Sequence, residues 1–473
     1  MNITELSAAQ LSEAIHARQV SCREVMAAYL DHIDVCNPAV NAIVSRRDRD
    51  EIMVEAAVCD EEIAHGLSRG WMHGIPQAIK DLAEAKGLPM TMGSPLFEHF
   101  VPDEDCLMVA RMKAAGCVVI GKTNVPEFGL GSHSFNEVFG VTRNPIDLDR
   151  TAGGSSGGAA VALATQMLPV ADGSDYMGSL RNPAAWNNIF GFRPSQGRVP
   201  ATPERDSFFG RMSTEGQMAR SVLDLALLLG TQAGYDRGSP SSLSGRLEEF
   251  ATVALTRVAL DGDPIGVRVG WLGDLDGHLA FEPGILDVCN EGLQRLAALG
   301  CDVHPTMFDM SPERVWDAWV VWRHVLVSAS LRPLLANPAN RERIKPEALW
   351  EFDNGELVTG PQLTEASLER TVFYQRFTDL FDRFDVLALP TAQVWPFEVT
   401  ERWPHHIGDR EMDTYHRWME VTAYATFAGL PAISVPVGFD DRGLPMGMQL
   451  IGRPRGDVEV LRLAHAYDLT LER

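Results

Sequence analysis

The sequence predicts an α/β fold in which a mixed central β-sheet is covered by helices on both faces. The chain has 473 residues, of which 45% are hydrophobic and 22% charged, enough to bury at least one full core and to exclude disordered and fibrous classes. Short apolar runs suited to buried strands alternate with segments of helical periodicity. No solenoid repeat or low-complexity tract interrupts this alternation.

Residues 5–35 predict two successive helices. Apolar residues recur at helical spacing, as at Leu11 and Ile15. Ser7 and Ser21 stand where N-cap residues are expected. The chain therefore begins as helical structure.

From about residue 110 the period of the pattern changes. A helix ending at Gly116 leads into Cys117 to Ile120, an apolar run suited to a buried strand. The alternation recurs with strands at 168–171, 265–271, 386–389, 432–437 and 446–451, and helices at 159–166, 282–299, 412–427 and from 458 onward.

We expect residues 1–473 to form a single domain. Residues 235–248 are rich in Gly, Ser and Pro and predict a surface linker within it. Residues 337–370, polar and interrupted by prolines, predict a peripheral helical insertion. Neither segment marks a domain boundary, because the α/β pattern resumes after each of them.

The charge balance argues against nucleic-acid and membrane-surface partners. Lys and Arg number 41 against 64 Asp and Glu, a formal charge of -23 that repels phosphate. The apolar stretch 315–335 is broken by Arg323, His324 and Arg332, too many charges for a bilayer-spanning helix.

Cysteine usage and the N-terminus predict a soluble cytoplasmic protein. The seven cysteines are scattered without a C-x-x-C pair, which is typical of reduced thiols rather than disulfides or a zinc site. The first residues carry no signal-peptide pattern. For a soluble enzyme of this size, a homodimer is the default expectation.

Residues 151–194 are the most informative stretch. Four glycines surround Ser155 and Ser156, and Gly173 and Gly178 flank a second serine-containing turn. Glycines at this density let backbone N–H groups gather around a developing negative charge. For a lone Gly-Gly pair, a tight turn is the preferred interpretation, but two such loops favour an anion-binding site.

Two segments match known sequence motifs, but the residues around them argue against both motifs. Gly116 to Thr123 matches the phosphate-binding pattern G-x-x-x-x-G-K-T, yet its variable residues form the predicted strand, so a structural turn is preferred. Gly153 to Gly157 matches the nucleophile elbow G-x-S-x-G, but the polar loop before it is not the strand that an elbow needs. The elbow remains an alternative.

Four separated regions resemble the amidase signature family of serine hydrolases, over nearly the whole chain. The signature itself matches Thr151 to Gly158 and Asp172 to Ala184. Supporting segments are Gly74 to Asp81, Gly121 to Phe128 and Gly429 to Pro436. The resemblance implies an amidohydrolase that needs no metal or organic cofactor and acts on a small-molecule amide.

The family's catalytic residues carry over to three positions. The resemblance implies that Ser179 is the nucleophile, Ser155 the bridging serine, whose peptide bond is typically cis in the family, and Lys80 the terminal base. A serine that attacks an amide needs a base, and the leaving nitrogen needs a proton. For this role Lys80 must be neutral near pH 7. Its pKa must therefore be lowered from about 10.4 by roughly three units, which corresponds to about 4 kcal/mol of differential burial and hydrogen bonding.

The remaining site residues lie around the nucleophile. Backbone N–H groups at positions 176–179 would form the oxyanion hole. The residues at these positions are Tyr176, Met177, Gly178 and Ser179. Asp175 and Arg181 are interpreted as loop-bracing residues, and Ser156 as a turn serine.

Tyr176 and Met177 stand where the family usually has Thr-Gly. Their run is similar to that of cyclic-amide hydrolases such as those acting on 6-aminohexanoate cyclic dimer, which suggests nylon-type oligomers as substrates. Two alternatives stay open, a glutaminase component of a tRNA-dependent amidotransferase and a catalytically silent small-molecule binding protein.

The specificity pocket is not defined by the sequence. Several aromatic residues could line an acyl pocket but are as readily explained as core. These are Trp316, Trp319, Trp322, Trp395, Phe397, Trp403 and Trp418. His133 could approach the site or be an ordinary loop histidine.

Overall fold

The central sheet is mixed, as predicted. The computed structural model describes residues 2–202, 206–245 and 247–471. Within them an eight-stranded sheet runs in the order β10-β9-β11-β15-β14-β7-β8-β6. Neighbours among β10 (Asp302–Pro305), β9 (Arg268–Trp271) and β11 (Val386–Pro390) are parallel. The antiparallel remainder is β15 (Pro445–Gly452), β14 (Ala432–Phe439), β7 (Phe190–Arg193), β8 (Thr214–Ala219) and β6 (Val170–Asp175).

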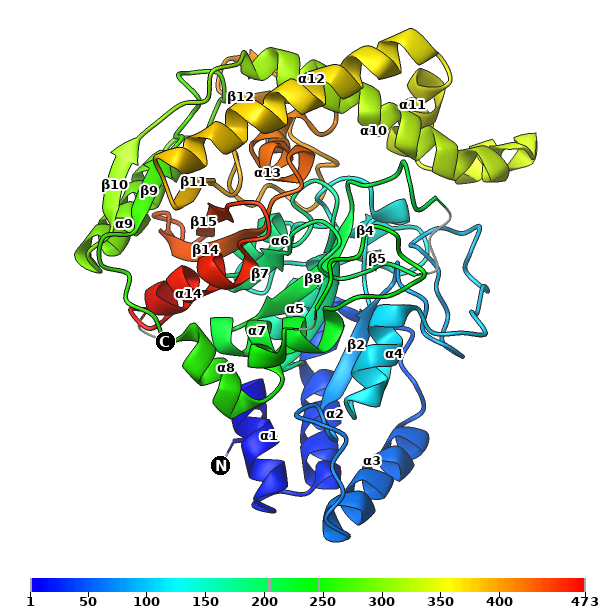
Figure 1. The fold of residues 1–473 in the computed structure, drawn as a ribbon. Coiled ribbons are helices and arrows are strands. Elements are labelled where there is room, and N and C mark those ends of the chain that lie inside the picture. The colour runs from blue at the N-terminus through cyan, green and yellow to red at the C-terminus, as the bar shows by residue number, and fades with distance from the viewer. Residues whose placement is uncertain (1, 203–205, 246, 472–473) are drawn as a thin grey trace.

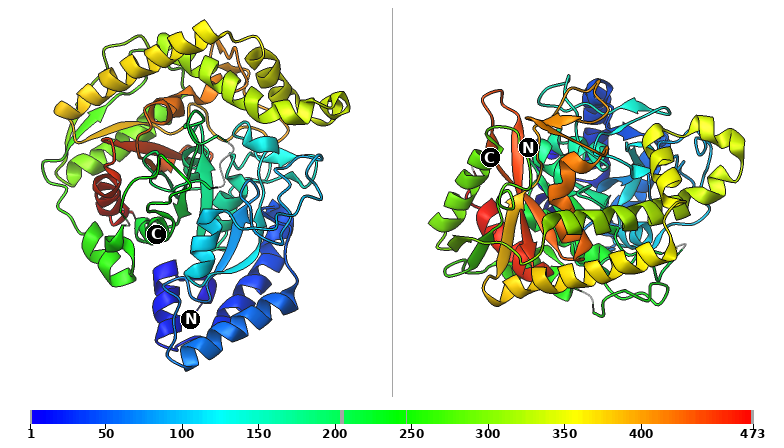
Figure 2. Two further views of the ribbon diagram at one scale, coloured as in Figure 1. Left: turned by 45° about the vertical axis from the view of Figure 1, so that its right-hand side comes forward. Right: turned by 90° about the horizontal axis from the view of Figure 1, so that it is seen from above.

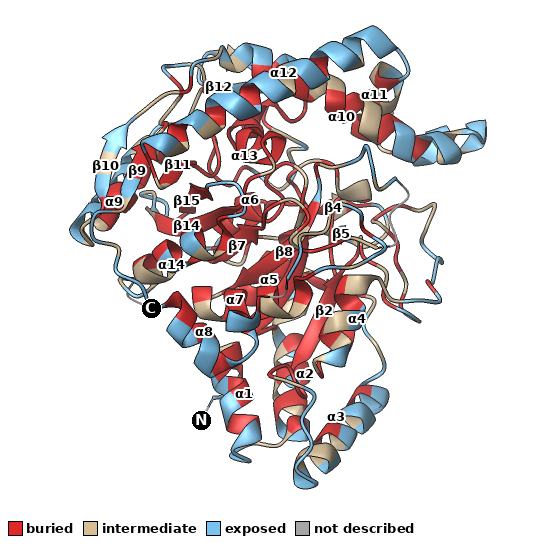
Figure 3. Ribbon diagram, in the orientation of Figure 1, coloured by how far each residue is buried: buried red, intermediate tan, exposed pale blue. Residues whose placement is uncertain are grey.

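Helices cover both faces of this sheet (Figure 1). On one face α9 (Ile285–Ala298) packs against Val437 and Met448. The short helix α6 (Arg181–Trp186) packs against Gly447, which faces the other way because neighbouring strand residues alternate between faces. Figure 3 shows the central strands buried between helices whose outer surfaces are exposed. The α/β sandwich predicted from the sequence is therefore confirmed.

The N-terminal third adds a second, three-stranded sheet of β1 (Ile43–Val44), β3 (Val118–Thr123) and β2 (Pro76–Lys80). The helices α1 (Ala8–His16) and α2 (Cys22–Val40) precede it, and α3 (Arg49–Ala64) lies between β1 and β2 in the chain; all three are at the bottom of Figure 1. Ser7 and Ser21 cap α1 and α2, each in a capping box, as predicted.

Three helices cross the opposite end of the molecule. The long α10 (Pro312–Leu335) packs against both α11 (Pro346–Gly355) and α12 (Gly360–Thr378), and both views in Figure 2 show α10 and α12 side by side. Segment 337–370, for which a peripheral insertion is expected, comprises a 3-10 turn (Pro338–Arg343), α11 and the first half of α12. Among the described helices, none is both long and apolar enough to cross a membrane.

The remaining helices and strands are short. The helices are α4 (Leu107–Ala114), α5 (Gly157–Ala164), α7 (Val222–Gln232), α8 (Val253–Leu260), α13 (Ala423–Phe427) and α14 (Asp457–Asp468), and two-residue ladders pair β4 (Phe135–Asn136) with β5 (Gly140–Val141) and β12 (His406–Ile407) with β13 (Arg410–Glu411). In segment 235–248, residue 246 lies outside the described residues, and the rest forms turns and bends before a 3-10 turn at Glu248–Phe250.

One predicted helix is wrong in extent. The expected helix 412–427 is a 3-10 segment at Arg417–Thr422 followed by α13. Tyr415 and His416, which should have opened the helix, are instead buried, and the Tyr415 hydroxyl donates to Glu351 of α11. This tertiary contact outweighs the local helical pattern.

Candidate active site

Polar side chains from four segments meet between the two sheets. Lys80 is the last residue of β2, and β2 packs against β6, the edge strand of the large sheet. Ser174 lies in β6, Ser155 and Ser156 precede α5, and Ser179 precedes α6. Strand ends and helix starts thus bring together residues 99 positions apart.

The side-chain nitrogen of Lys80 is at the centre of this cluster. Its Nζ lies 2.9 Å from Ser155 Oγ, 2.8 Å from Ser156 Oγ and 2.9 Å from Ser174 Oγ, and 3.1 Å from the Ser174 carbonyl oxygen. The lysine is 1% exposed, and burial lowers its pKa to about 8. Ser156, interpreted as a turn serine, therefore contacts the lysine as closely as Ser155 does.

Carboxylates oppose the effect of burial on Lys80. Asp172 accepts a hydrogen bond from the Lys80 backbone N–H at 3.0 Å, and Glu215 of β8 pairs with Ser174 across the ladder. The negative charges of Glu215 and Asp172 raise the pKa of Lys80, while burial raises the pKa of Glu215 to about 7. Sequence reasoning gave no role to Ser174, Asp172 or Glu215. The first two belong to the glycine-rich segment, whereas no motif points to Glu215.

Ser179 faces an open space. Its Oγ hydrogen-bonds to no other described residue, although the whole residue is only 8% exposed. The peptide bond between Gly154 and Ser155 is cis. Ser156 donates its backbone N–H to the Ser179 carbonyl oxygen at 3.2 Å, which ties the two loops together.

The predicted oxyanion donors do not all point the same way. The Gly178 N–H donates to Asp175 Oδ1 at 2.9 Å, so this donor is already occupied. The N–H groups of Tyr176, Met177 and Ser179 have no acceptor among the described residues. Three of the four donors thus remain free to bind a ligand oxygen.

Asp175 and Arg181 form a buried brace beneath this turn. The carboxylate pairs with Arg181 at 3.0 Å and with Arg193 at 3.4 Å, and it also accepts from the Leu180 N–H at 3.3 Å. Burial alone would raise the pKa of Asp175, but the two guanidinium groups hold it well below its usual range. Neither Asp175 nor Arg181 lines the cavity.

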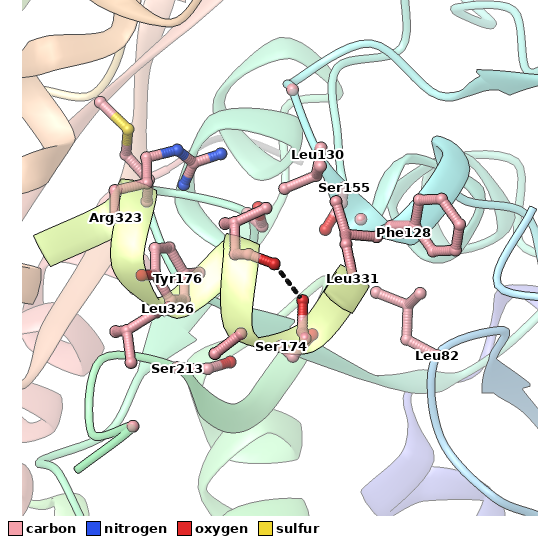
Figure 4. Close-up of a pocket in the computed structure, with 18 of the residues that line it drawn as sticks. Leu82, Phe128, Leu130, Ser155, Ser174, Tyr176, Ser213, Arg323, Leu326 and Leu331 are labelled. Carbon is pink, nitrogen blue, oxygen red and sulfur yellow. Dashed lines mark hydrogen bonds between the residues drawn. The ribbon is translucent and has the colours of Figure 1, made fainter. Parts of the chain in front are cut away.

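A cavity of about 530 Å³ opens beside Ser179. Ser155, Ser174, Tyr176, Met177 and Ser179 form one part of its wall, and α10 forms another (Figure 4). Its apolar surface comes mainly from Leu82, Phe128, Leu130, Phe209, Leu326 and Leu331.

The aromatic residues considered from sequence lie elsewhere. None of the seven lines this cavity, and six of them are buried in the core. His133 is also buried, bonded to the Val399 carbonyl at 3.0 Å and to Thr151 Oγ1 at 2.8 Å, and burial lowers its pKa to about 4. It is a structural histidine that does not reach the cavity.

The structure also shows that neither of the two motif matches forms the site that its motif describes. Lys122 of the phosphate-loop pattern lies inside β3, fully buried, and donates to the Ala83 carbonyl at 2.6 Å, so no phosphate loop exists there. Residues 142–156 form only isolated bridges, so no strand leads into Ser155 as a nucleophile elbow requires.

One grouping of metal-ligating side chains occurs among the described residues, away from the cavity. The ligand atoms of Cys59, Glu62 and His73 lie within 4.8 Å of one another. Glu62 is already paired with Arg69 at 2.5 Å, and His73 Nε2 lies 2.9 Å from the Cys59 carbonyl oxygen. These contacts explain the grouping without an ion.

Comparison with known proteins agrees with this geometry. The family model described as Amidase matches residues 24–461. The chain is 32% identical to the A subunit of the glutamyl-tRNA(Gln) amidotransferase from Acidothermus cellulolyticus, over 98% of this chain and 94% of that protein. It is 31% identical to an acylamidase of Rhodococcus erythropolis, over 99% and 96% respectively.

Solved structures resemble the chain over its full length. A bacterial aryl acylamidase of the amidase signature family superposes with a TM-score of 0.91 at 31% identity, covering 98% of this chain and 96% of that one. The 6-aminohexanoate cyclic dimer hydrolase complexed with substrate gives a TM-score of 0.86 at 25% identity, covering 100% and 98%.

Proposed function

The chain belongs to the amidase (amidase signature) family and hydrolyses amides, and we propose that it does so through an acyl-enzyme on Ser179 with Ser155 and Lys80 as a proton relay. The observation that carries this proposal is the contact of 2.9 Å between Lys80 Nζ and Ser155 Oγ. This contact lies beside the cavity, and the Ser179 Oγ, which has no partner among the described residues, faces the same cavity.

The surroundings of Lys80 allow the neutral amine to act as the base of this relay. A neutral amine has two N–H donors and one lone pair, whereas the Ser174 carbonyl oxygen can only accept. Since Nζ has three serine hydroxyls around it as well, one hydroxyl can donate to the lone pair. We assign this donor to Ser155, whose oxygen can then accept the proton of Ser179.

The reaction follows from this relay. As Ser179 Oγ attacks the carbonyl carbon, its proton moves to Ser155 Oγ and the Ser155 proton moves to Lys80 Nζ. The oxyanion is stabilised by the free N–H groups of Tyr176, Met177 and Ser179. The relay then returns a proton to the amide nitrogen as the C–N bond breaks, so the amine leaves and the acyl group stays on Ser179 as an ester. Water, deprotonated by the same relay, then attacks this ester and releases the carboxylic acid and Ser179. These steps require no cofactor.

The lining of the cavity supports an apolar amide as substrate. Leucine and phenylalanine side chains form part of its walls, which suits aliphatic or aryl groups on either side of the scissile bond. A bacterial aryl acylamidase and the 6-aminohexanoate cyclic dimer hydrolase are both structural relatives, so linear amides, aryl amides and lactams form the substrate screen.

The alternatives are less well supported. Components of glutamyl-tRNA(Gln) amidotransferases are among the relatives, but Tyr176 and Met177 stand where the family usually has Thr-Gly, which argues against a glutaminase role. A silent binding protein would have no use for a buried lysine held against Ser155. We further propose a homodimer, measurable by light scattering, and a cytoplasmic location, which suits the seven free cysteines.

Labelling with a fluorophosphonate tests the nucleophile. Wild-type protein should gain one adduct, mapped to Ser179 by peptide mass, and Lys80→Ala should label at least about 100-fold more slowly because the base is lost. Lys113→Ala, a surface lysine paired with Asp105, is the matched control and should label at the wild-type rate. An adduct on Ser155 or Ser156, or no adduct, would contradict the assignment.

A further inference from the structure

We infer that Arg323 forms a subsite that binds a carboxylate or carbonyl oxygen carried by the substrate at a distance from the scissile amide. This inference rests on the proposed function of the same cavity. Arg323 lies on α10 and lines the cavity, although its side chain is only 3% exposed. Figure 4 shows Arg323 and Tyr176 on one side of the cavity in that view and Ser155 on the other.

The guanidinium group of Arg323 is held in place on two of its three nitrogens. Nε donates to Glu351 Oε1 at 2.5 Å, and Nη2 donates to the Tyr415 hydroxyl at 2.6 Å. The Tyr176 ring lies 5.2 Å from the guanidinium carbon, within the range of a cation–π contact. The side chain is therefore positioned before any ligand arrives.

The third nitrogen, Nη1, has no hydrogen-bond partner among the described residues. A guanidinium group has five N–H donors and no acceptor, so Nη1 retains two unused donors. Because Arg323 lines the cavity, a ligand oxygen there can accept from these donors. Charge-assisted N–H donors of this kind suit an oxygen of a carboxylate or an amide carbonyl.

The charge of Arg323 is balanced by an ionised carboxylate on the side away from Nη1. Arg323 and its neighbours bring the pKa of Glu351 down to about 2 despite burial, so this pair stays ionised at working pH. Glu351 is further engaged by His324 at 2.6 Å. Arg332, another cation on the cavity wall, is instead paired with Glu356 at 2.7 Å.

The acid on the cavity wall does not compete for Arg323. Asp206 lines the cavity, but its Oδ1 accepts from the backbone N–H groups of Phe208 and Phe209 at 3.0 and 3.2 Å. Apolar side chains such as Leu326 and Leu331 also line the cavity. The substrate class that fits is an amide with an apolar spacer that ends in a carboxylate or a second amide.

Matched substrates separate a binding role from a structural one. On the acyl side, adipic acid monoanilide is compared with hexananilide, and 6-anilino-6-oxohexanamide supplies a carbonyl in place of the carboxylate. On the amine side, N-hexanoyl-6-aminohexanoate is compared with N-hexanoylhexylamine. In one of these two sets, wild-type enzyme should prefer the acceptor-bearing substrate in kcat/KM.

Arg323→Met should reduce that preference at least about 20-fold, as expected for loss of a hydrogen bond to a charged group. Arg323→Lys should retain part of it for the carboxylate only, because lysine keeps the charge but not the paired donors. Arg370→Met is the matched control and should leave the preference unchanged. Arg370 also stacks on aromatic rings, Trp322 and Phe427, but does not line the cavity.

Because Arg323→Met removes the arginine partner of the buried Glu351, the double variant Arg323→Met/Glu351→Gln is measured beside it. Calorimetric binding of the same compounds to Ser179→Ala gives a readout that needs no turnover. If wild type hydrolyses none of the amides but Ser179→Ala binds the carboxylate through Arg323, the proposed function fails and the subsite stands. An equal loss for both members of each set, or no loss in turnover and binding, would overturn the subsite.

Discussion

The state of Lys80 is set by opposing effects at single residues. Burial lowers its pKa, and the carboxylates of Glu215, Asp172 and Asp175 raise it, with a resulting pKa of about 8. Because only the neutral amine can accept a proton, kcat/KM should fall about tenfold for each pH unit below that value. The rate should level off above it.

Glu215→Gln tests this balance directly. Removing the carboxylate removes the largest effect that raises the Lys80 pKa, so the acidic limb of the kcat/KM profile should move to lower pH by about one unit. The profile is measured with an amide whose own groups do not titrate between pH 5 and 10. Glu411→Gln, at an exposed position, is the control and should not move the limb. An unshifted limb in Glu215→Gln would show that Lys80 does not limit the rate.

The sequence predicts some of these residues and not others, for a physical reason. Lys80, Ser155 and Ser179 lie in contiguous motifs whose spacing is visible along the chain. Glu215 and Arg323 act through space, from a strand and a helix far away in sequence. In the sequence, Arg323 is recognisable only as a charge that argues against a membrane-spanning helix. No local pattern shows that a residue will line a particular cavity.

At the scale of elements, the turn between β6 and α6 positions the nucleophile. Gly178 has a φ of 84°, and a Cβ added there would lie 2.7 Å from Cγ2 and Oγ1 of Thr422. Its N–H is also held by Asp175. Both the backbone conformation and the available space therefore require glycine.

Gly178→Ala should reduce kcat/KM at least about 100-fold, because the turn must shift and carry the Ser179 N–H with it. The loss of stability should be about 1–3 kcal/mol, typical of overpacking, so the variant should still fold. Amide turnover is measured beside unfolding followed by circular dichroism. Near-normal turnover in a folded variant would show that this turn tolerates displacement and is not the oxyanion site.

Elements were predicted from the sequence where local signals suffice. The caps at Ser7 and Ser21 and the apolar runs of β3, β11, β14 and β15 act locally, and the structure confirms them. Strands β2 and β8 were not predicted, because Gln77 and Lys80 in one and Glu215 and Gln217 in the other break the apolar pattern. These polar residues face the site or buried partners. They therefore replace the apolar residues by which a buried strand is recognised in a sequence.

At the scale of the whole molecule, contacts join distant parts of the chain. Strands from residues 170–219 share one sheet with strands from residues 386–452. At the other end, Arg257 of α8 pairs with Glu13 of α1 at 2.6 Å. We propose that such long-range contacts make residues 1–473 one cooperative folding unit rather than separable domains.

Asp224 provides the sharpest test of that unit. It is 1% exposed on α7, and its carboxylate accepts from the N–H groups of Ala8 and Ala9 at 3.1 and 2.9 Å, which fixes the start of α1 to the central body. Asp224→Ala should lower the free energy of unfolding by about 3 kcal/mol, because two buried donors lose a charged acceptor. Asp224→Asn keeps one acceptor oxygen and should lose about half as much.

In a cooperative molecule this loss must weaken every element together. Urea unfolding followed by tryptophan fluorescence and by far-ultraviolet circular dichroism should then give coincident transitions, both moved to lower urea in Asp224→Ala. None of the ten tryptophans lies in α1–α3, although Trp71 follows α3, so fluorescence reports mainly on the rest of the chain, whereas the dichroism reports on these helices as well. An early loss of helix at unchanged fluorescence would show that the N-terminal helices unfold alone and that the chain is not a single cooperative unit.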